Sequence, residues 1–241
     1  GRYPKRAMKL SRIISNQNGV SRRQANQLLA SGRVSVDGQR CQDGAEEVSR
    51  FQEVRIDQNI IQQAEPAYYL MLHKPAGYLS ATKDDQHPTV MELIAPNIRE
   101  HLHIGGRLDR ASTGLLILSS DGLWSRRLTE PDIKLPKTYR VTTASPISPE
   151  TATRFAEGIW FEYEQLTTSP AQLEQLNDCE ARVTIFEGRY HQVKRMFHAV
   201  GNRITSLHRE SMGSLALDPE LPVGGYRHLS GDEISSVGGR S

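Results

Sequence analysis

The chain has 241 residues, of which 37% are hydrophobic and 24% are charged, with a formal net charge of +2. This composition is typical of a folded globular protein, and no apolar stretch approaches the roughly 18 residues that a membrane span needs. The polar, basic start has no signal-peptide core, so we expect a cytoplasmic protein in which a small domain precedes a larger one. Met8 is a natural start, so residues 1–7 are either a vector-derived remnant or a disordered basic arm. Cys41 and Cys179 form no Cys-x-x-Cys motif, and neither a disulfide framework nor a zinc site is expected.

The basic side chains are concentrated in two segments. Residues 1–40 contain nine basic side chains and one acidic one, Asp37, which gives a local net charge of +8. Residues 188–209 contain five basic side chains and no acidic one. Either patch alone is compatible with an ordinary solvated surface, whereas two such patches on a nearly neutral chain indicate a polyanionic partner.

The first elements in chain order are two short helices and a hairpin. Apolar residues around Ile14 predict the first helix, and Ser21 is a favourable N-cap for a second helix that ends before Gly32. Residues 34–36 alternate as a strand, and Asp37-Gly38 follows as a strong hairpin turn signal. Further strands are expected within residues 48–56.

This segment resembles the S4 RNA-binding module, through Ser21-Arg22-Arg23 at the start of the second helix and Gly32-Arg33-Val34 after its end. The resemblance implies that Arg22, Arg23 and Arg33 contact RNA phosphates, and a helix N-terminus would add partial positive charge to the first two. Lys9-Leu10-Ser11 departs from the usual Arg-Leu-Asp of such modules. We expect an S4-like domain over residues 8–57, and a linker over 58–67 because this stretch is polar, lacks periodicity and contains a proline.

The remaining elements, in a second domain over residues 68–236, are predicted from apolar periodicity and turn residues. The first half contains a strand over 68–72 before a loop at 74–77, a polar loop over 84–89, a short helix over 90–94, a buried strand over 115–118 and a helix over 123–129. The second half contains a strand over 137–141, a helix over 149–158, strands over 170–176 and 180–186, a helix over 191–200 and a strand over 205–215. Ser148 is the expected N-cap of the helix over 149–158, with Pro149 at its first position.

Residues 105–122 are the stretch around which this second segment is organised. Asp109 lies between Arg107 and Arg110 in a glycine-rich loop, just before the buried strand. A carboxylate in a loop next to a rigid strand is well placed for catalysis, although such an aspartate is also a common turn residue or N-cap.

Four motifs in this segment closely resemble those of pseudouridine synthases of the RsuA family, in the family's order and at about its spacing. They are Leu72-His73-Lys74-Pro75-Ala76-Gly77, Gly106-Arg107-Leu108-Asp109 followed by Ser112-Thr113-Gly114-Leu115-Leu116, Lys137-Thr138-Tyr139, and the run from Glu187 through Gly188-Arg189-Tyr190-His191-Gln192-Val193-Lys194-Arg195 to Met196. With the S4-like segment, the resemblance covers nearly the whole chain. It implies an α+β fold in which a mixed, mainly antiparallel sheet is flanked by helices.

The resemblance also implies an activity, the site-specific isomerisation of uridine to pseudouridine in ribosomal RNA. Small-subunit RNA, free or as an assembly intermediate with ribosomal proteins, is the favoured substrate and a monomer the favoured state. No redox change occurs in this isomerisation, so no cofactor is expected. The family motifs assign Asp109, Tyr139 and Lys194 to catalysis. They assign substrate binding to Arg107, Leu207, Lys74, Arg189 and Arg195, with Lys74 also supporting the aspartate loop.

Other functions remain open from the sequence. The enzyme could act on large-subunit RNA, or the chain could be a non-catalytic RNA-binding or ribosome-assembly factor, which the intact Asp109, Tyr139 and Lys194 disfavour. An aspartate-dependent N-glycoside hydrolase would share the nucleophile, but such enzymes usually need a second carboxylate, and none is evident. His101, His103 and His191 lie in no recognised metal motif, so no catalytic metal is expected.

Overall fold

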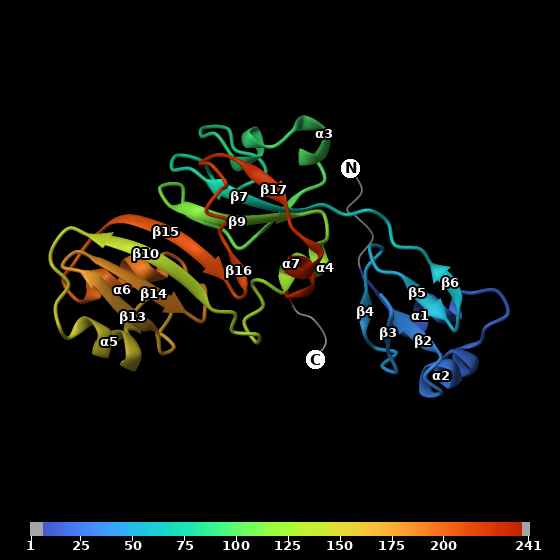
Figure 1. Cartoon of the computed structure of the whole chain (residues 1–241). Helices are drawn as coiled ribbons and strands as arrows, with labels where there is room; N and C mark the ends of the chain where they lie inside the picture. The colour runs from blue at the N-terminus through green and yellow to red at the C-terminus, as the bar shows by residue number, and fades with distance from the viewer. Residues whose placement is uncertain (1–6, 238–241) are drawn as a thin grey trace. The chain divides into compact units, whose positions relative to one another are not determined.

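The computed structural model describes residues 7–237, so the expectation for residues 1–7 falls, except for Ala7, outside the described residues. The chain forms two compact units that are divided between Ala67 and Tyr68 (Figure 1). Each unit has its own hydrophobic core. No helix between residues 7 and 237 has the length and apolar character to cross a membrane.

Two small sheets and two helices make up the N-terminal unit from residue 7 onward. Its elements are β1 (Met8–Lys9), α1 (Leu10–Ser15), α2 (Arg22–Ala30), β2 (Val34–Val36), β3 (Gln39–Arg40), β4 (Glu47–Val48), β5 (Val54–Ile56) and β6 (Asn59–Gln62). Ser21 caps α2 as predicted, because its hydroxyl accepts from the Gln24 amide while the Gln24 side chain accepts from the Ser21 amide. Asp37 and Gly38 both have positive φ, which confirms the hairpin turn between β2 and β3.

The expected linker over residues 58–67 is wrong for its first half. Residues Asn59 to Gln62 form β6, which pairs antiparallel with β5 at the edge of a sheet ordered β3-β2-β5-β6. Asp57 makes the turn between the two strands, with a φ of 54°. The polar composition concealed a hairpin whose second strand belongs to the N-terminal unit.

A mixed sheet of nine strands dominates the described part of the C-terminal unit, with the order β13-β14-β10-β15-β9-β7-β17 and with β16 and β8 paired to β15 and β9. The strands are β7 (Tyr69–Lys74), β8 (His103–Gly105), β9 (Thr113–Ser119), β10 (Lys137–Thr143), β13 (Gln172–Asn177), β14 (Glu180–Ile185), β15 (Ile204–Met212), β16 (Leu215–Ala216) and β17 (Tyr226–His228). All pairs are antiparallel except β15 with β9. The predicted mixed, mainly antiparallel sheet is therefore confirmed.

Helices flank this sheet, and a separate hairpin joins β11 (Trp160–Phe161) to β12 (Leu166–Thr167). The helices are η1 (Val90–Leu93), α3 (Pro96–Arg99), α4 (Gly122–Arg126), α5 (Thr151–Glu157), α6 (Gln192–Ala199) and α7 (Gly231–Ser235). Figure 1 shows α5 and α6 beside the half of the sheet that contains β10, β13 and β14. Phe155 of α5 and Phe197 of α6 pack edge to face there, with ring centroids 4.9 Å apart.

Two predicted helices differ from those observed. The helix expected from Pro149 begins only at Thr151, because the Thr151 amide donates to the Ser148 carbonyl and closes a turn. The Ser148 hydroxyl pairs with the Thr151 hydroxyl and does not cap the helix. The helix expected over 123–129 ends at Arg126, where tighter turns continue the chain to Thr129.

The central strands β7 and β9 are buried on both faces. Leu70 and Leu72 belong to the core that also includes α5 and α6, whereas Met71 between them belongs to a second core on the opposite face, with Trp124 and Met212. Burial on both faces explains why these strands lack polar alternation in the sequence.

The two halves of the sheet meet where Gly114 of β9 lies against Arg209 of β15. The parallel pairing covers only His208 with Thr113 and Arg209 with Gly114. Gly114 has a φ of 110°, and a Cβ atom there would lie 2.3 Å from the Arg209 carbonyl oxygen. Only glycine permits this backbone conformation and this approach.

We expect Gly114→Ala to destabilise the C-terminal unit by about 3 kcal/mol or more, because the new methyl group meets backbone atoms and the residue must keep a positive φ. Both tryptophans, Trp124 and Trp160, lie in this unit, so a urea titration followed by tryptophan fluorescence measures the loss. Gly122→Ala is the matched control, since a Cβ on Gly122 meets no atom within 4 Å. Equal stability of the two variants would contradict the assigned role of Gly114.

Candidate active site

The loop between β8 and β9, residues 106–112, carries Asp109, and Arg209 holds its first residue and the strand that follows it. The guanidinium of Arg209 is buried and donates to the carbonyl oxygens of Gly106, at 2.7 Å, and of Leu115, at 2.9 Å. A buried charge is tolerated only when such hydrogen bonds satisfy it. Arg209 therefore ties the start of the loop to strand β9, which follows the loop.

Lys74, at the end of β7, holds the middle of the same loop. Its side chain is fully buried, and its ammonium donates to three carbonyl oxygens, those of Pro75, Arg110 and Ser112, at 2.7–3.0 Å. Burial lowers the pKa of Lys74 to about 8, an effect that the charge of Asp109 opposes. The structure thus places Lys74 beneath the loop and not among the residues that line the pocket described next.

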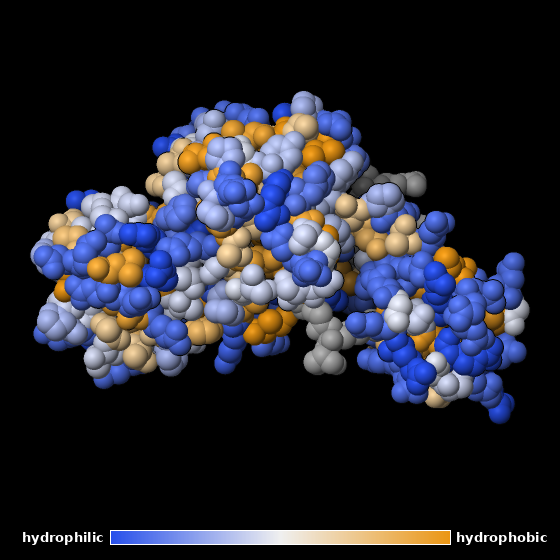
Figure 2. All heavy atoms as spheres, in the orientation of Figure 1, coloured by the Kyte–Doolittle hydropathy of each residue, from blue (hydrophilic) through white to orange (hydrophobic). Residues whose placement is uncertain are grey.

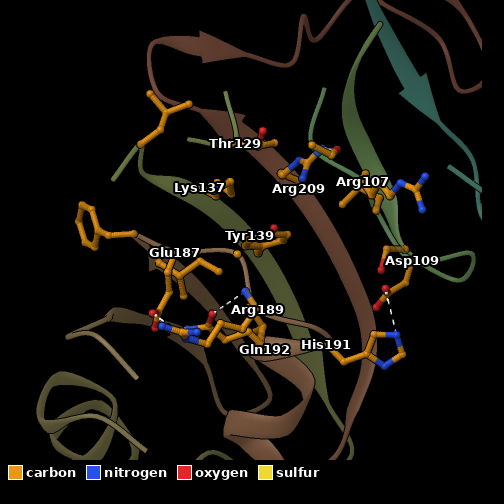
Figure 3. Close-up of a pocket in the computed structure, with 18 of the residues that line it drawn as sticks. Arg107, Asp109, Thr129, Lys137, Tyr139, Glu187, Arg189, His191, Gln192 and Arg209 are labelled. Atoms are coloured by element: carbon orange, nitrogen blue, oxygen red, sulfur yellow. Dashed lines mark hydrogen bonds and ion pairs between the residues drawn. The ribbon is translucent and has the colours of Figure 1, made fainter. Parts of the chain in front are cut away.

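Asp109 lies at one end of a pocket of about 440 Å³ (Figure 3). The second carboxylate oxygen, Oδ2, lies 3.7 Å from Nζ of Lys194, and Oδ1 lies 3.2 Å from Nε2 of His191. Asp109 and Lys194, predicted together from two distant motifs, are therefore close in space. All three side chains are about one-third exposed, so solvent and ligand can reach them.

His191 is a site residue that the sequence reasoning did not select. It is the N-cap of α6 and has a φ of 48°, in the left-handed region that residues other than glycine seldom adopt. Its ring stacks on that of Tyr190, with centroids 3.9 Å apart. The sequence predicted the helix over 191–200. It did not predict the left-handed backbone conformation that directs the imidazole of His191 to Asp109.

Strands β10 and β15 form a wall of the pocket. Tyr139 lies opposite Arg209 in the register of the two strands, and Leu207 lies opposite Val141. Tyr139 and Leu207, which the family resemblance assigns to catalysis and substrate binding, both line the pocket. Within residues 7–237 the Tyr139 hydroxyl has no hydrogen-bond partner.

Lys137 of β10 also lines this wall, although the sequence reasoning gave it no role. Its side chain is largely buried, and burial together with the charge of Arg209 lowers its pKa, whereas Glu187 raises it. The cations Lys137 and Arg209 and the carboxylate Glu187 thus line the same pocket. The hydroxyl of Ser112, buried in the pocket lining, is a polar group left without a partner in the described chain.

The remaining predicted substrate-binding residues divide into two groups. Arg107 and Arg189 line the pocket, and Nε of Arg189 donates to Glu187 at 3.0 Å. Arg195 lies outside the pocket, where its guanidinium makes a bidentate pair with Glu164. Across residues 7–237 no three histidine, cysteine, aspartate or glutamate side chains gather where they could hold a metal ion.

In the N-terminal unit, Arg22 and Arg23 occupy the first positions of α2 and are exposed. Figure 2 shows a predominantly hydrophilic surface around α2. Arg22 also lines a groove with Lys9 and Arg12, between α1 and α2. Arg33 differs, because its guanidinium forms a bidentate pair with Asp57 that offsets its charge.

Comparisons with known proteins agree with this division of the chain. A family model described as RNA pseudouridylate synthase matches residues 68–199, and one described as S4 domain matches residues 8–62. A solved structure titled "Crystal structure of pseudouridylate synthase" superposes with a TM-score of 0.70 at 37% identity, covering 96% of this chain and 100% of the other.

Two relatives are both called ribosomal small subunit pseudouridine synthase A. The one from Pseudomonas aeruginosa is 50% identical, over 95% of this chain and 100% of its own length. The one from Yersinia pestis is 46% identical, over 96% of this chain and 98% of its own length. Identity at this level extends across both units of the chain. The protein therefore belongs to the RNA pseudouridylate synthase family, in the form that carries an N-terminal S4 domain.

Proposed function

We propose that this protein isomerises one uridine of small-subunit ribosomal RNA to pseudouridine, with Asp109 as the catalytic carboxylate. The observation that carries the proposal is the position of Asp109, on a loop fixed by buried hydrogen bonds, facing a pocket and close to Lys194. The names of the Pseudomonas and Yersinia relatives support the choice of small-subunit RNA.

The reaction conserves every atom of the nucleotide. The bond between C1′ and N1 breaks, the uracil turns, a bond forms between C1′ and C5, and the proton on C5 leaves while N1 regains one. No electron acceptor is needed. The enzyme must supply a carboxylate at the reacting sugar or base, a surface that holds the detached ring, and positive charge near the uracil anion.

In this proposal Asp109 acts in its ionised form, on the sugar or on the base. Lys194, whose Nζ lies 3.7 Å from Oδ2 of Asp109, is its counter-charge. His191 fixes the other carboxylate oxygen from 3.2 Å. Held from two sides, the carboxylate is oriented before the substrate arrives, which lowers the entropy loss on reaching the transition state.

The walls of the pocket suit a nucleobase taken out of its stack. Tyr139 stacks on one face of the uracil, and Leu207 packs against the other. Such contacts offset the few kcal/mol that flipping a base out of its stack costs. Arg107 occupies the gap that the base leaves in the RNA, and Arg189, whose charge Glu187 offsets, is a further substrate contact in the pocket lining.

The S4 unit supplies affinity for RNA that depends little on the nucleotide sequence. Arg22 and Arg23 bind phosphates at the start of α2, and Arg33 contributes less because Asp57 offsets its charge. We place the enzyme in the cytoplasm as a monomer, since one chain provides all of the proposed catalytic groups. Its substrate is small-subunit RNA, free or partly assembled with ribosomal proteins.

Incubation with unmodified small-subunit RNA and, separately, large-subunit RNA tests this function, followed by carbodiimide treatment and primer-extension mapping. We expect one new stop, in the small-subunit RNA. A stop only in the large-subunit RNA would overturn the substrate, and release of free uracil would instead indicate a glycoside hydrolase.

Asp109→Asn should abolish this stop while RNA affinity stays within a few-fold, because asparagine keeps the shape of the side chain and loses its charge. Asp178→Asn is the matched control, since Asp178 is exposed in the turn between β13 and β14 and does not line the pocket. Product from the Asp109 variant at the control rate would rule out the assignment.

Tyr139→Phe should keep RNA binding and lower the single-turnover rate by about a hundredfold, because the ring of this pocket-lining residue still stacks while its hydroxyl is removed. The measurement is single-turnover kinetics at saturating enzyme, which separates the chemical step from binding. A wild-type rate would exclude a necessary role for the phenol and leave Tyr139 as a stacking surface alone.

The double variant Arg22→Ala, Arg23→Ala should flatten the salt dependence of RNA binding, by about one unit of the log–log slope for each phosphate that the protein no longer binds. Filter binding across a series of KCl concentrations measures this slope. Arg154→Ala, an exposed arginine on α5, is the control for loss of positive charge. If the double variant keeps the wild-type slope, the N-terminal unit does not contact phosphate.

A further inference from the structure

A second hollow lies next to the active-site pocket and is separate from it. Its volume is about 680 Å³, and it is lined by Tyr163, Glu164, Gly188, Arg189, Tyr190 and Arg195. Gly188 and Arg189 line both the hollow and the pocket, so the two are adjacent along this short segment.

Two aromatic rings are exposed on this hollow. Tyr163, in the turn between β11 and β12, is 94% exposed, and Tyr190, just before α6, is 76% exposed. They come from segments far apart in the sequence, yet line the same surface. We call this pair the tyrosine platform.

Arg195 holds the platform in place. Its guanidinium donates to both carboxylate oxygens of Glu164, at 2.7 and 2.8 Å, and lies over the ring of Phe161 at 3.8 Å. It also donates to the backbone carbonyl of Tyr190 at 3.1 Å. One side chain of α6 thus ties the hairpin turn to the segment that carries Tyr190, and Glu164 offsets its charge.

The platform is connected to the catalytic carboxylate through His191. The ring of Tyr190 stacks on that of His191 with an interplanar angle of 16°, and Nε2 of His191 lies 3.2 Å from Asp109. A ligand seated on the tyrosines therefore lies one ring away from the residue that contacts Asp109.

We propose that the tyrosine platform binds unpaired bases of the RNA next to the target uridine. Exposed aromatic faces bind single-stranded RNA by stacking and tolerate any base, since every base has a π face. A strand whose uridine enters the pocket must continue past its rim, and Gly188 and Arg189 form the part of that rim that leads to the platform. This inference rests on the proposed function, because it takes the pocket as the site of the flipped uridine.

The chemistry of the platform predicts how its contribution differs from that of the S4 unit. Stacking releases few counterions, whereas arginines that bind phosphates release many. Loss of the tyrosines should therefore weaken RNA binding by a similar factor at every salt concentration.

Tyr163→Ala is the sharpest test, since Tyr163 has no contact with His191 or Asp109. We expect KM for the mapped small-subunit RNA to rise about fivefold to a hundredfold, with the loss in KM rather than in kcat and with an unchanged salt slope. Tyr163→Phe should restore the wild-type KM, because the ring remains. Tyr190→Ala should also raise KM and Tyr190→Phe should restore it, but because the Tyr190 ring stacks on His191, only the Tyr163 pair separates KM from kcat. Wild-type KM in both alanine variants would overturn the proposal, as would a loss that phenylalanine does not restore.

Photocrosslinking gives a readout that does not depend on turnover. The RNA carries 5-bromouridine at single positions on either side of the target, and crosslinked peptides are identified by mass spectrometry. Crosslinks to Tyr163 or Tyr190 are expected, and crosslinks found only elsewhere would overturn the proposal. If these tyrosines crosslink while no pseudouridine forms, the platform is supported and the proposed function fails. If pseudouridine forms while the crosslinks lie elsewhere, the proposed function is supported and the platform fails.

Discussion

The close approach of Gly114 to Arg209 is the constraint on which the site depends. It joins β9 to β15 through only two residue pairs, and it brings the guanidinium of Arg209 to the carbonyl of Gly106, where the Asp109 loop begins, and to that of Leu115 in β9. A side chain larger than hydrogen at position 114 would separate the strands. The same contact therefore joins the two halves of the sheet and sets the position of the loop that carries Asp109.

The loop illustrates how a charged active site can be built from buried backbone contacts. Lys74 and Arg209 direct their charges at carbonyl oxygens of the loop, so neither competes for the carboxylate of Asp109. Asp109 is then free to face the pocket, with Lys194 and His191 as its close partners. Because the loop is fixed by hydrogen bonds that the substrate does not make, little reorganisation is required when RNA binds.

Sequence patterns predicted the elements that depend on neighbouring residues, and they failed for elements and side chains whose structure depends on tertiary contacts. The cap at Ser21, the turn at Asp37-Gly38 and the strand around residues 115–118 each follow from a few neighbouring residues, and all are observed. Strand β6 was missed because its pairing with β5 outweighs its polar composition. His191 was missed because its role depends on a left-handed backbone conformation. Lys74 supports the Asp109 loop, as expected, through hydrogen bonds to its carbonyl oxygens, whereas packing pairs the charge of Arg195 with Glu164.

The RNA contacts that we propose for the two units differ in their physical basis. The N-terminal unit presents arginines at a helix start, which attract any phosphate backbone and lose strength as salt is added. The surface beside the pocket instead presents rings, and its arginines are already paired with Glu164 and Glu187. Stacking requires bases that are not in a helix, so it discriminates by the shape of the RNA rather than by its charge. An enzyme that must select one uridine among many needs this second kind of discrimination close to Asp109, because phosphate contacts are the same at every nucleotide.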